Sequence, residues 1–128
     1  LQYQFVLPLE ECQEGLPIIL ERIAASGLGS FLAVLKLLGA GRDMLSFPLK
    51  GYTLALDFPV SARTFALFEE LDRLVLPFGG RLYLTKDARM GPTMLEEGYP
   101  DVHSFRAVRE AHDPQQMLSS LQSRRLRL

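Results

Sequence analysis

Four stretches of the chain have the pattern of β-strands: three alternate apolar with polar or small residues, and the second is apolar on both sides apart from Lys36. These stretches are residues 1–7, 30–38, 51–58 and 81–84. Two further segments, 9–26 and 62–76, repeat their apolar positions at helical spacing. Ser61 stands where a helix-capping residue is expected before the second of them. The pattern therefore predicts four strands and two long helices.

Each predicted helix has one apolar stripe. The expected buried residues are Cys12, Leu16, Ile19 and Ile23 in the first helix, and Phe65, Phe68, Leu71 and Val75 in the second. Gly15 and Pro17 indicate that the first turns of the first helix are kinked or separate. Glu69 and Arg73 have the spacing of an exposed ion pair on the second.

The order of the elements, β-α-β-β-α-β, predicts an α+β fold of the ferredoxin-like type, in which two helices cover one face of an antiparallel sheet. A C-terminal helical extension is expected to follow. Its predicted helices are residues 92–98, 101–110 and 115–126. Their inward side chains are expected to be Val102, Phe105 and Val108, and then Met117, Leu118 and Leu121.

The side of the sheet that faces away from the helices carries a mixture of polar and apolar side chains. They are Gln2, Gln4, Val34, Lys36, Thr53, Ala55, Asp57, Arg81 and Tyr83. Such a face is neither a core nor an ordinary solvated surface. It predicts a site that is covered by a structure outside this chain.

Composition limits the classes of function that the chain can have. The 128 residues suffice for one domain. Because 14 basic residues nearly balance 15 acidic ones, the net charge does not favour nucleic-acid binding. The single cysteine, Cys12, fits a reducing compartment. His103 and His112 have no third ligand at metal spacing, so no metal site is expected. Because the chain opens at Leu1 without Met, we expect a piece of a longer protein.

The stretch after Gly79 and Gly80 contains the best candidates for chemistry. Tyr83 and Lys86 lie within three residues of each other at the end of a strand, where a phenol and an amine can act as proton-transfer partners. The alternative is that Tyr83 packs and Lys86 is solvated.

Several segments resemble FAD-linked oxidases of the vanillyl-alcohol-oxidase superfamily, and among these the decaprenylphosphoryl-β-D-ribose 2'-oxidases and the aldonolactone oxidases most closely. They are residues 1–8 (LQYQFVLP), 30–36 (SFLAVLK), 45–48 (LSFP), 57–59 (DFP), 78–87 (FGGRLYLTKD), 113–114 (DP) and 124–126 (RRL). The resemblance covers nearly the whole chain in colinear order.

This resemblance implies that residues 1–128 form the substrate-binding domain of a flavoenzyme whose separate N-terminal domain, absent here, holds the FAD. The implied substrate-binding residues are Gln2, Gln4, Leu32, Val34, Lys36 and Thr53. Thr53 and Ala55 would lie beside the flavin ring, and Tyr83 and Lys86 match the active-site tyrosine and lysine. Lys86 can reach the flavin only if the fourth strand ends by about Leu84. The closest relatives have Asn and Cys at the positions of Thr53 and Ala55, which leaves the sugar open.

The implied function is oxidation of a sugar or polyol hydroxyl to a carbonyl, with hydride transfer to FAD and loss of the hydroxyl proton to a base near Lys86 and Tyr83. Expected partners are the FAD-binding domain and a sugar or lipid-linked sugar, in the cytoplasm or at a membrane periphery. Alone, the segment is expected to be inactive. The alternatives are an aldonolactone oxidase, or a stand-alone ferredoxin-like module that binds a small ligand or a second copy of itself through the open face.

Overall fold

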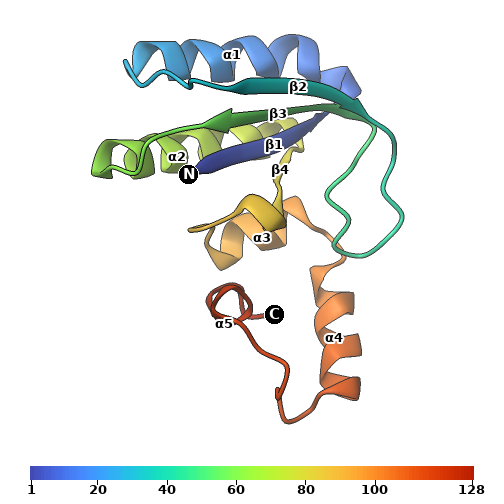
Figure 1. Cartoon of the computed structure of the whole chain (residues 1–128). Coiled ribbons are helices and arrows are strands. Elements are labelled where there is room, and N and C mark those ends of the chain that lie inside the picture. Colours follow the sequence, from blue (N-terminus) through green and yellow to red (C-terminus); the bar gives the residue numbers. More distant parts are fainter.

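A four-stranded antiparallel sheet forms the centre of the molecule in the computed structural model, which describes all 128 residues. The strands β1 (Gln2–Pro8), β2 (Ala33–Leu38), β3 (Gly51–Asp57) and β4 (Arg81–Leu82) lie in the order β2-β3-β1-β4. Figure 1 shows the two long helices on one side of this sheet. The predicted α+β, ferredoxin-like arrangement is confirmed.

Two strands are shorter than predicted by two residues or more, and β3 ends one residue early, at Asp57. β2 begins at Ala33 and not at residue 30, because the Ser30 hydroxyl donates to the carbonyl of Leu32 (2.6 Å) and accepts the N–H of Asp57 (2.9 Å). These side-chain bonds of Ser30 interrupt the regular ladder before Ala33. β4 ends at Leu82 and not at residue 84, and a 3-10 turn, Leu84–Lys86, follows it.

The helix α1 (Cys12–Ala25) follows a separate 3-10 turn, Leu9–Glu11, so the first turn is distinct as predicted, although Pro17 lies inside the continuous helix. The helix α2 (Ala62–Val75) is capped by the Ser61 hydroxyl, which accepts the N–H of Thr64 at 3.1 Å.

The buried stripe of α2 differs from the prediction by one position. Its buried residues are Thr64, Leu67, Phe68, Leu71 and Val75, and Phe65 is only half-buried. This set follows the spacing of three and four residues from Thr64, which leaves Phe65 at the flank. The predicted pair Glu69–Arg73 does not form. The ion pairs of α2 instead join Glu70 to Arg22 and Asp72 to Arg89.

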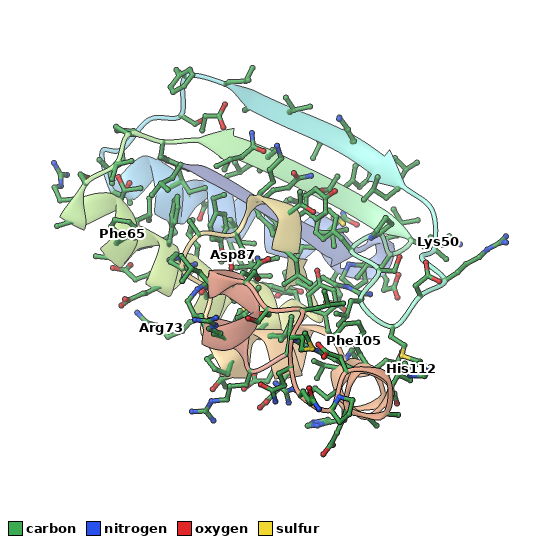
Figure 2. The ribbon with its side chains drawn as sticks, turned by 60° about the horizontal axis from the view of Figure 1, so that its bottom comes forward. Lys50, Phe65, Arg73, Asp87, Phe105 and His112 are labelled. Carbon is green, nitrogen blue, oxygen red and sulfur yellow. The ribbon has the colours of Figure 1, made fainter.

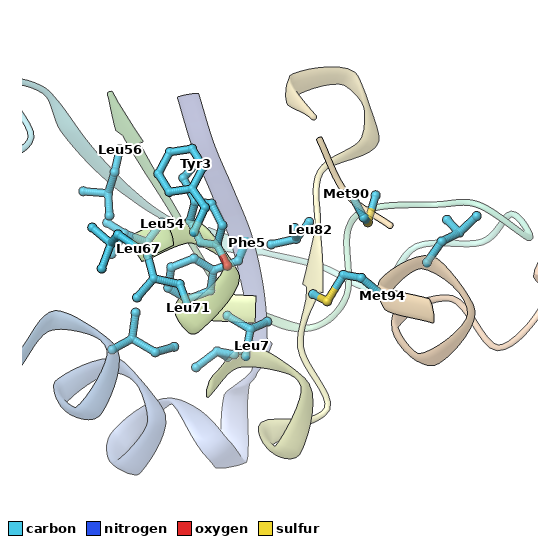
Figure 3. Close-up of a cluster of buried hydrophobic side chains, with 14 of the residues drawn as sticks. Tyr3, Phe5, Leu7, Leu54, Leu56, Leu67, Leu71, Leu82, Met90 and Met94 are labelled. Carbon is cyan, nitrogen blue, oxygen red and sulfur yellow. The ribbon is translucent and has the colours of Figure 1, made fainter. Parts of the chain in front are cut away.

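The core lies between the sheet and its two helices and continues past β4. Figure 3 shows Tyr3, Phe5 and Leu7 of β1 gathered with Leu54 and Leu56 of β3 and with Leu67 and Leu71 of α2. On the other side of β1, Leu82 meets Met90 and Met94. The same core therefore holds the helical extension against the sheet.

The extension consists of α3 (Pro92–Gly98), α4 (Val102–His112) and α5 (Leu121–Leu126). The bounds of α3 are those predicted. In α4, Val102 is buried and Phe105 half-buried, but Val108 is exposed and not inward. Figure 1 shows α4 and α5 below the sheet, with the C-terminus beside α5.

The prediction of a helix over residues 115–126 was wrong in its first half. The Asp113 carboxylate accepts the N–H groups of Met117 (2.8 Å) and Leu118 (2.9 Å), which closes a turn in place of a helix. Ser120 then caps a new, shorter helix. As a result Met117, Leu118 and Leu121 are exposed, and Leu126 is the buried residue of α5.

None of the helices combines the length and the apolar character that a membrane-spanning helix requires. No three His, Cys, Asp or Glu side chains gather in a group that could hold a metal ion. Cys12 is buried, and its thiol donates to the carbonyl of Pro8 at 3.0 Å.

Candidate functional site

The side chains on the sheet face opposite the helices form three rows that run across the strands. The pairing of β2, β3 and β1 aligns Val34 with Ala55 and Ala55 with Gln4. The Tyr83 N–H donates to the carbonyl of Gln4 at 2.9 Å, which adds Tyr83 to this central row. Because paired residues of an antiparallel sheet point to the same side, the row predicted from parity exists.

Rows of similar composition flank the central one. On one side, Lys36 pairs with Thr53, Thr53 with Val6, and Val6 with Arg81. On the other, Leu32 and Gln2 flank Asp57: the Asp57 N–H donates to the carbonyl of Leu32 at 3.2 Å, and the Gln2 amide donates to the Asp57 carboxylate at 2.8 Å. The face thus presents amides, one carboxylate and the cationic side chains of Lys36 and Arg81 beside aliphatic groups.

A small hollow lies at the edge of this face, where β4 ends and the chain leaves β1. Gln2, Gln4, Tyr83 and Lys86 are among the residues that line it. Its volume is about 20 Å³, little more than one water molecule needs. A ligand larger than a water molecule would therefore lie over the hollow and against the sheet face, within reach of the polar groups in the hollow's walls.

The short β4 decides where Lys86 lies. If the strand continued as far as Lys86, the alternation of side chains would direct Lys86 toward the helices. The strand ends at Leu82, however, and the 3-10 turn Leu84–Lys86 changes the direction of the chain. The condition stated for Lys86, that the strand end by about Leu84, is met. Lys86 is exposed, and its ammonium makes no hydrogen bond or ion pair within the chain.

Part of the face is covered by the chain itself, which the sequence did not predict. The loop between β2 and β3 lies over the end near β4: Phe47 stacks on Tyr83 with ring centroids 4.4 Å apart, and Arg81 donates to the carbonyl of Ser46 at 3.0 Å. Val6 and Thr53 are buried although they belong to the open face. The uncovered part is therefore limited to the rows of Gln2 and Gln4 and to β2.

Hydrogen bonds fix two of the predicted polar residues. The Thr53 hydroxyl donates to the carbonyl of Phe5 at 2.7 Å and accepts the amide N–H of Gln4 at 3.1 Å. The Gln4 side chain is thus directed along the face, with its carbonyl oxygen away from Thr53. This arrangement leaves the side-chain carbonyl oxygen of Gln4 free to accept a hydrogen bond from a ligand hydroxyl.

Behind the hollow, a polar network joins the sheet, α2 and the segment after Lys86. Arg89 donates from both terminal nitrogens to the Asp72 carboxylate (2.7 and 2.6 Å), which also accepts the Tyr3 hydroxyl at 2.9 Å. Burial of Tyr3, together with the Asp72 charge, raises the pKa of its phenol well above the ordinary value. Tyr3 therefore stays protonated and acts as a donor.

Asp87 anchors the same segment from inside the molecule. Its carboxylate accepts the N–H groups of Arg89 (2.8 Å) and Met90 (2.6 Å) and pairs with Arg125 of α5 at 2.8 Å. Burial alone would raise the pKa of Asp87, but these hydrogen bonds and the Arg125 charge lower it below the ordinary value. Figure 2 shows Asp87 between the sheet and the C-terminal helices, unlike the peripheral Lys50 and Arg73.

The predicted site residues fall into two groups. Gln2, Gln4, Tyr83 and Lys86 surround the hollow, with Thr53 bonded to Gln4 and Ala55 paired with it. Leu32, Val34 and Lys36 share the face but come from the β2 edge, two strands away from β1 and outside the hollow's lining. One ligand contacts both groups only if it extends across β3.

Sequence reasoning missed Asp87 and Arg89, which line the hollow, and Phe47, which stacks on Tyr83. Phe47 lies in a loop without periodicity, although the segment 45–48 belonged to the resemblance. Asp87 and Arg89 directly follow Lys86, so the density of charge there, Lys-Asp-Ala-Arg, was the available signal.

Comparisons with known proteins place the chain in a family. Residues 51–126, more than half of the chain, match the family model described as D-arabinono-1,4-lactone oxidase. The decaprenylphosphoryl-beta-D-ribose oxidase of Mycolicibacterium smegmatis is 43% identical over the whole chain, which covers 28% of that relative. An uncharacterized protein in the mprA 5' region of Streptomyces coelicolor is 38% identical over 91% of the chain and 32% of its own length. The chain thus spans about a third or less of these relatives. The matches confirm the resemblance to FAD-linked oxidases.

Proposed function

This chain belongs to the D-arabinono-1,4-lactone oxidase family, and we propose that it forms the substrate-binding part of an FAD-dependent oxidoreductase that oxidises a sugar hydroxyl to a carbonyl. The observation that carries the proposal is the joint position of Tyr83, Lys86, Gln2 and Gln4 around one hollow at the edge of the sheet face. The family is described as a lactone oxidase, and the relative from Mycolicibacterium smegmatis is named a decaprenylphosphoryl-beta-D-ribose oxidase.

The residues present fit a flavin ring. Ala55 is a small side chain in the central row between Val34 and Gln4, so a flat ring system can lie close to the sheet there. The amides of Gln2 and Gln4 and the Tyr83 hydroxyl supply donors and acceptors at its rim. FAD, held mainly by a part of the protein outside this chain, would accept the hydride from the carbinol carbon of the sugar.

The chain's own residues would orient the sugar and handle its proton. Gln4, held by Thr53, accepts a hydrogen bond from a sugar hydroxyl, and Lys36 and Val34 contact the more distant part of the substrate. The Lys86 ammonium stabilises the negative charge that develops on the reacting oxygen. The Tyr83 hydroxyl, held under Phe47, passes the hydroxyl proton toward solvent. The carbinol carbon becomes a carbonyl carbon.

Anaerobic mixing of the full-length flavoprotein with candidate alcohols tests this proposal. Bleaching of the flavin by a lipid-linked ribose or a related sugar is expected. Bleaching only by a free aldonolactone would support the second candidate, an aldonolactone oxidase, which the family description favours. Absence of bleaching with every alcohol would contradict the proposal and favour a non-catalytic ligand-binding module.

A further inference from the structure

The segment that carries Lys86, residues 83–90, is joined to two helices that are distant in sequence. We call this segment the lysine turn. It has no long regular element of its own, only the 3-10 turn Leu84–Lys86. Its own backbone bonds are short-range: the N–H of Lys86 donates to Tyr83 (3.0 Å) and that of Asp87 to Leu84 (3.2 Å). Its position must therefore be set by contacts from elsewhere.

On one side, α2 holds the end of the lysine turn. Arg89 forms the two-pronged pair with Asp72 and donates to the carbonyl of Phe68 at 3.2 Å. Both charged side chains are largely shielded, with 16% and 14% of their areas exposed. Shielded two-pronged pairs have a defined geometry, so this contact fixes Arg89.

On the other side, α5 holds the middle of the lysine turn. Arg125 reaches Asp87 (2.8 Å) with one terminal nitrogen and the carbonyl of Met90 with the other. The Gln122 amide donates to the carbonyl of Leu84 at 2.6 Å. Leu126, fully buried next to Arg125, anchors α5 in the core.

We propose that Arg125 is a positioning residue for Lys86: by bridging the Asp87 carboxylate and the Met90 carbonyl, it holds the lysine turn so that Lys86 stays at the hollow with Gln2 and Gln4. This inference rests on the proposed function. The ammonium of Lys86 has no partner in the chain, so its location depends on the backbone that Arg125 and Arg89 fix.

The bridge needs an arginine. The planar guanidinium places two parallel donors on two different acceptors, whereas a lysine ammonium is a compact charge at the end of a flexible stem. Arg124, its neighbour in sequence, provides a matched control because it is exposed and donates only to the Ser119 hydroxyl (3.1 Å). Changing either arginine removes one positive charge from the same helix.

The first arm of the test measures how well the backbone of the lysine turn is held in place in the full-length protein. Hydrogen exchange of the Arg89 and Met90 amides, both bonded to Asp87, is expected to become about tenfold faster or more in Arg125→Gln. Arg124→Gln is expected to leave it unchanged. Unchanged exchange in Arg125→Gln would overturn the inference whether or not the protein oxidises sugars.

The second arm measures flavin reduction under anaerobic conditions. Arg125→Gln is expected to slow it roughly 10- to 100-fold, the effect of a displacement of about 1 Å at a reacting group. Arg125→Lys is expected to recover part of the rate. In a Lys86→Ala background, Arg125→Gln is expected to cause little further loss, because Arg125 acts through Lys86.

The outcomes separate the two proposals. An equal loss in the parent and the Lys86→Ala backgrounds would show a general structural role for Arg125 and overturn the inference. A parent that no alcohol reduces would contradict the proposed function, while the exchange arm would still decide whether Arg125 holds the turn. If Arg125→Gln does not fold, Arg125→Lys replaces it in both the hydrogen-exchange and the flavin-reduction measurements.

Discussion

Replacement of Asp72 by alanine should destabilise the chain strongly, because Asp72 is the centre of the polar network behind the hollow. Its carboxylate accepts three donors: the Tyr3 hydroxyl and two nitrogens of Arg89. Asp72→Ala leaves the Arg89 cation between the Tyr3 and Phe68 rings, 5.9 and 5.5 Å from their centroids, without its counter-ion. Cation–π attraction offsets only part of that loss.

The expected loss is about 3 kcal/mol. Removing one partner of a buried ion pair costs roughly 3–5 kcal/mol, and the lower end applies because both side chains retain some solvent contact. With a urea m-value of about 1.5 kcal/mol/M, the unfolding midpoint should fall by roughly 2 M. Circular dichroism with tyrosine fluorescence can follow unfolding, because the chain has four tyrosines and no tryptophan.

Two further variants test whether the unpaired Arg89 charge causes the loss of stability. Asp72→Leu combined with Arg89→Leu should be more stable than Asp72→Ala, because no unpaired charge is left. Glu70→Ala, which breaks the exposed pair with Arg22, should have little effect. A midpoint for Asp72→Ala close to that of Glu70→Ala would refute the account of the network. So would a double variant less stable than Asp72→Ala.

Three other predictions concern the backbone, acid stability and the isolated chain. Gly80→Ala should cost about 1–3 kcal/mol, since its Cβ would lie 2.8 Å from the Val6 carbonyl oxygen; Gly29→Ala, with open space around it, should leave the thermal midpoint nearly unchanged. Because the folded pKa of Asp87 is lowered, its contribution to stability is present above the unfolded pKa of roughly 3.9 and is lost as pH falls through the folded value. Asp87→Asn should therefore flatten the acid side of a plot of urea midpoint against pH, and an unchanged slope would contradict this. The isolated 128-residue chain should retain no flavin after gel filtration, where a yellow fraction would count against the prediction, and its partly open face should favour self-association.

The sheet and its two faces could be predicted because alternation is a strong signal when one face is buried. The parity of Gln4, Thr53 and Tyr83 followed directly from it. The bounds of α3 were also predictable, since Pro92 favours a helix start and Gly98 a helix end. These features depend on neighbours in sequence.

The features that sequence reasoning missed depend on contacts between distant residues. Arg125 and Asp87 are 38 positions apart, and no local pattern pairs them. Phe47 covers Tyr83 from a loop, where periodicity carries no information. The helix expected from residue 115 failed because the Asp113 side chain competes for the N–H groups of Met117 and Leu118, an effect of side-chain geometry and not of the apolar pattern.

The rate of anaerobic flavin reduction in a Lys86→Ala variant of the full-length protein tests the central claim most directly. If Lys86 stabilises the developing charge on the substrate oxygen, reduction should be roughly 10²–10³-fold slower than in the parent, with flavin content unchanged. Lys86→Arg should rescue poorly, and Lys50→Ala, which removes an exposed lysine from the β2–β3 loop, should match the parent. A Lys86→Ala rate within about threefold of the parent would contradict the account and assign Lys86 a structural role.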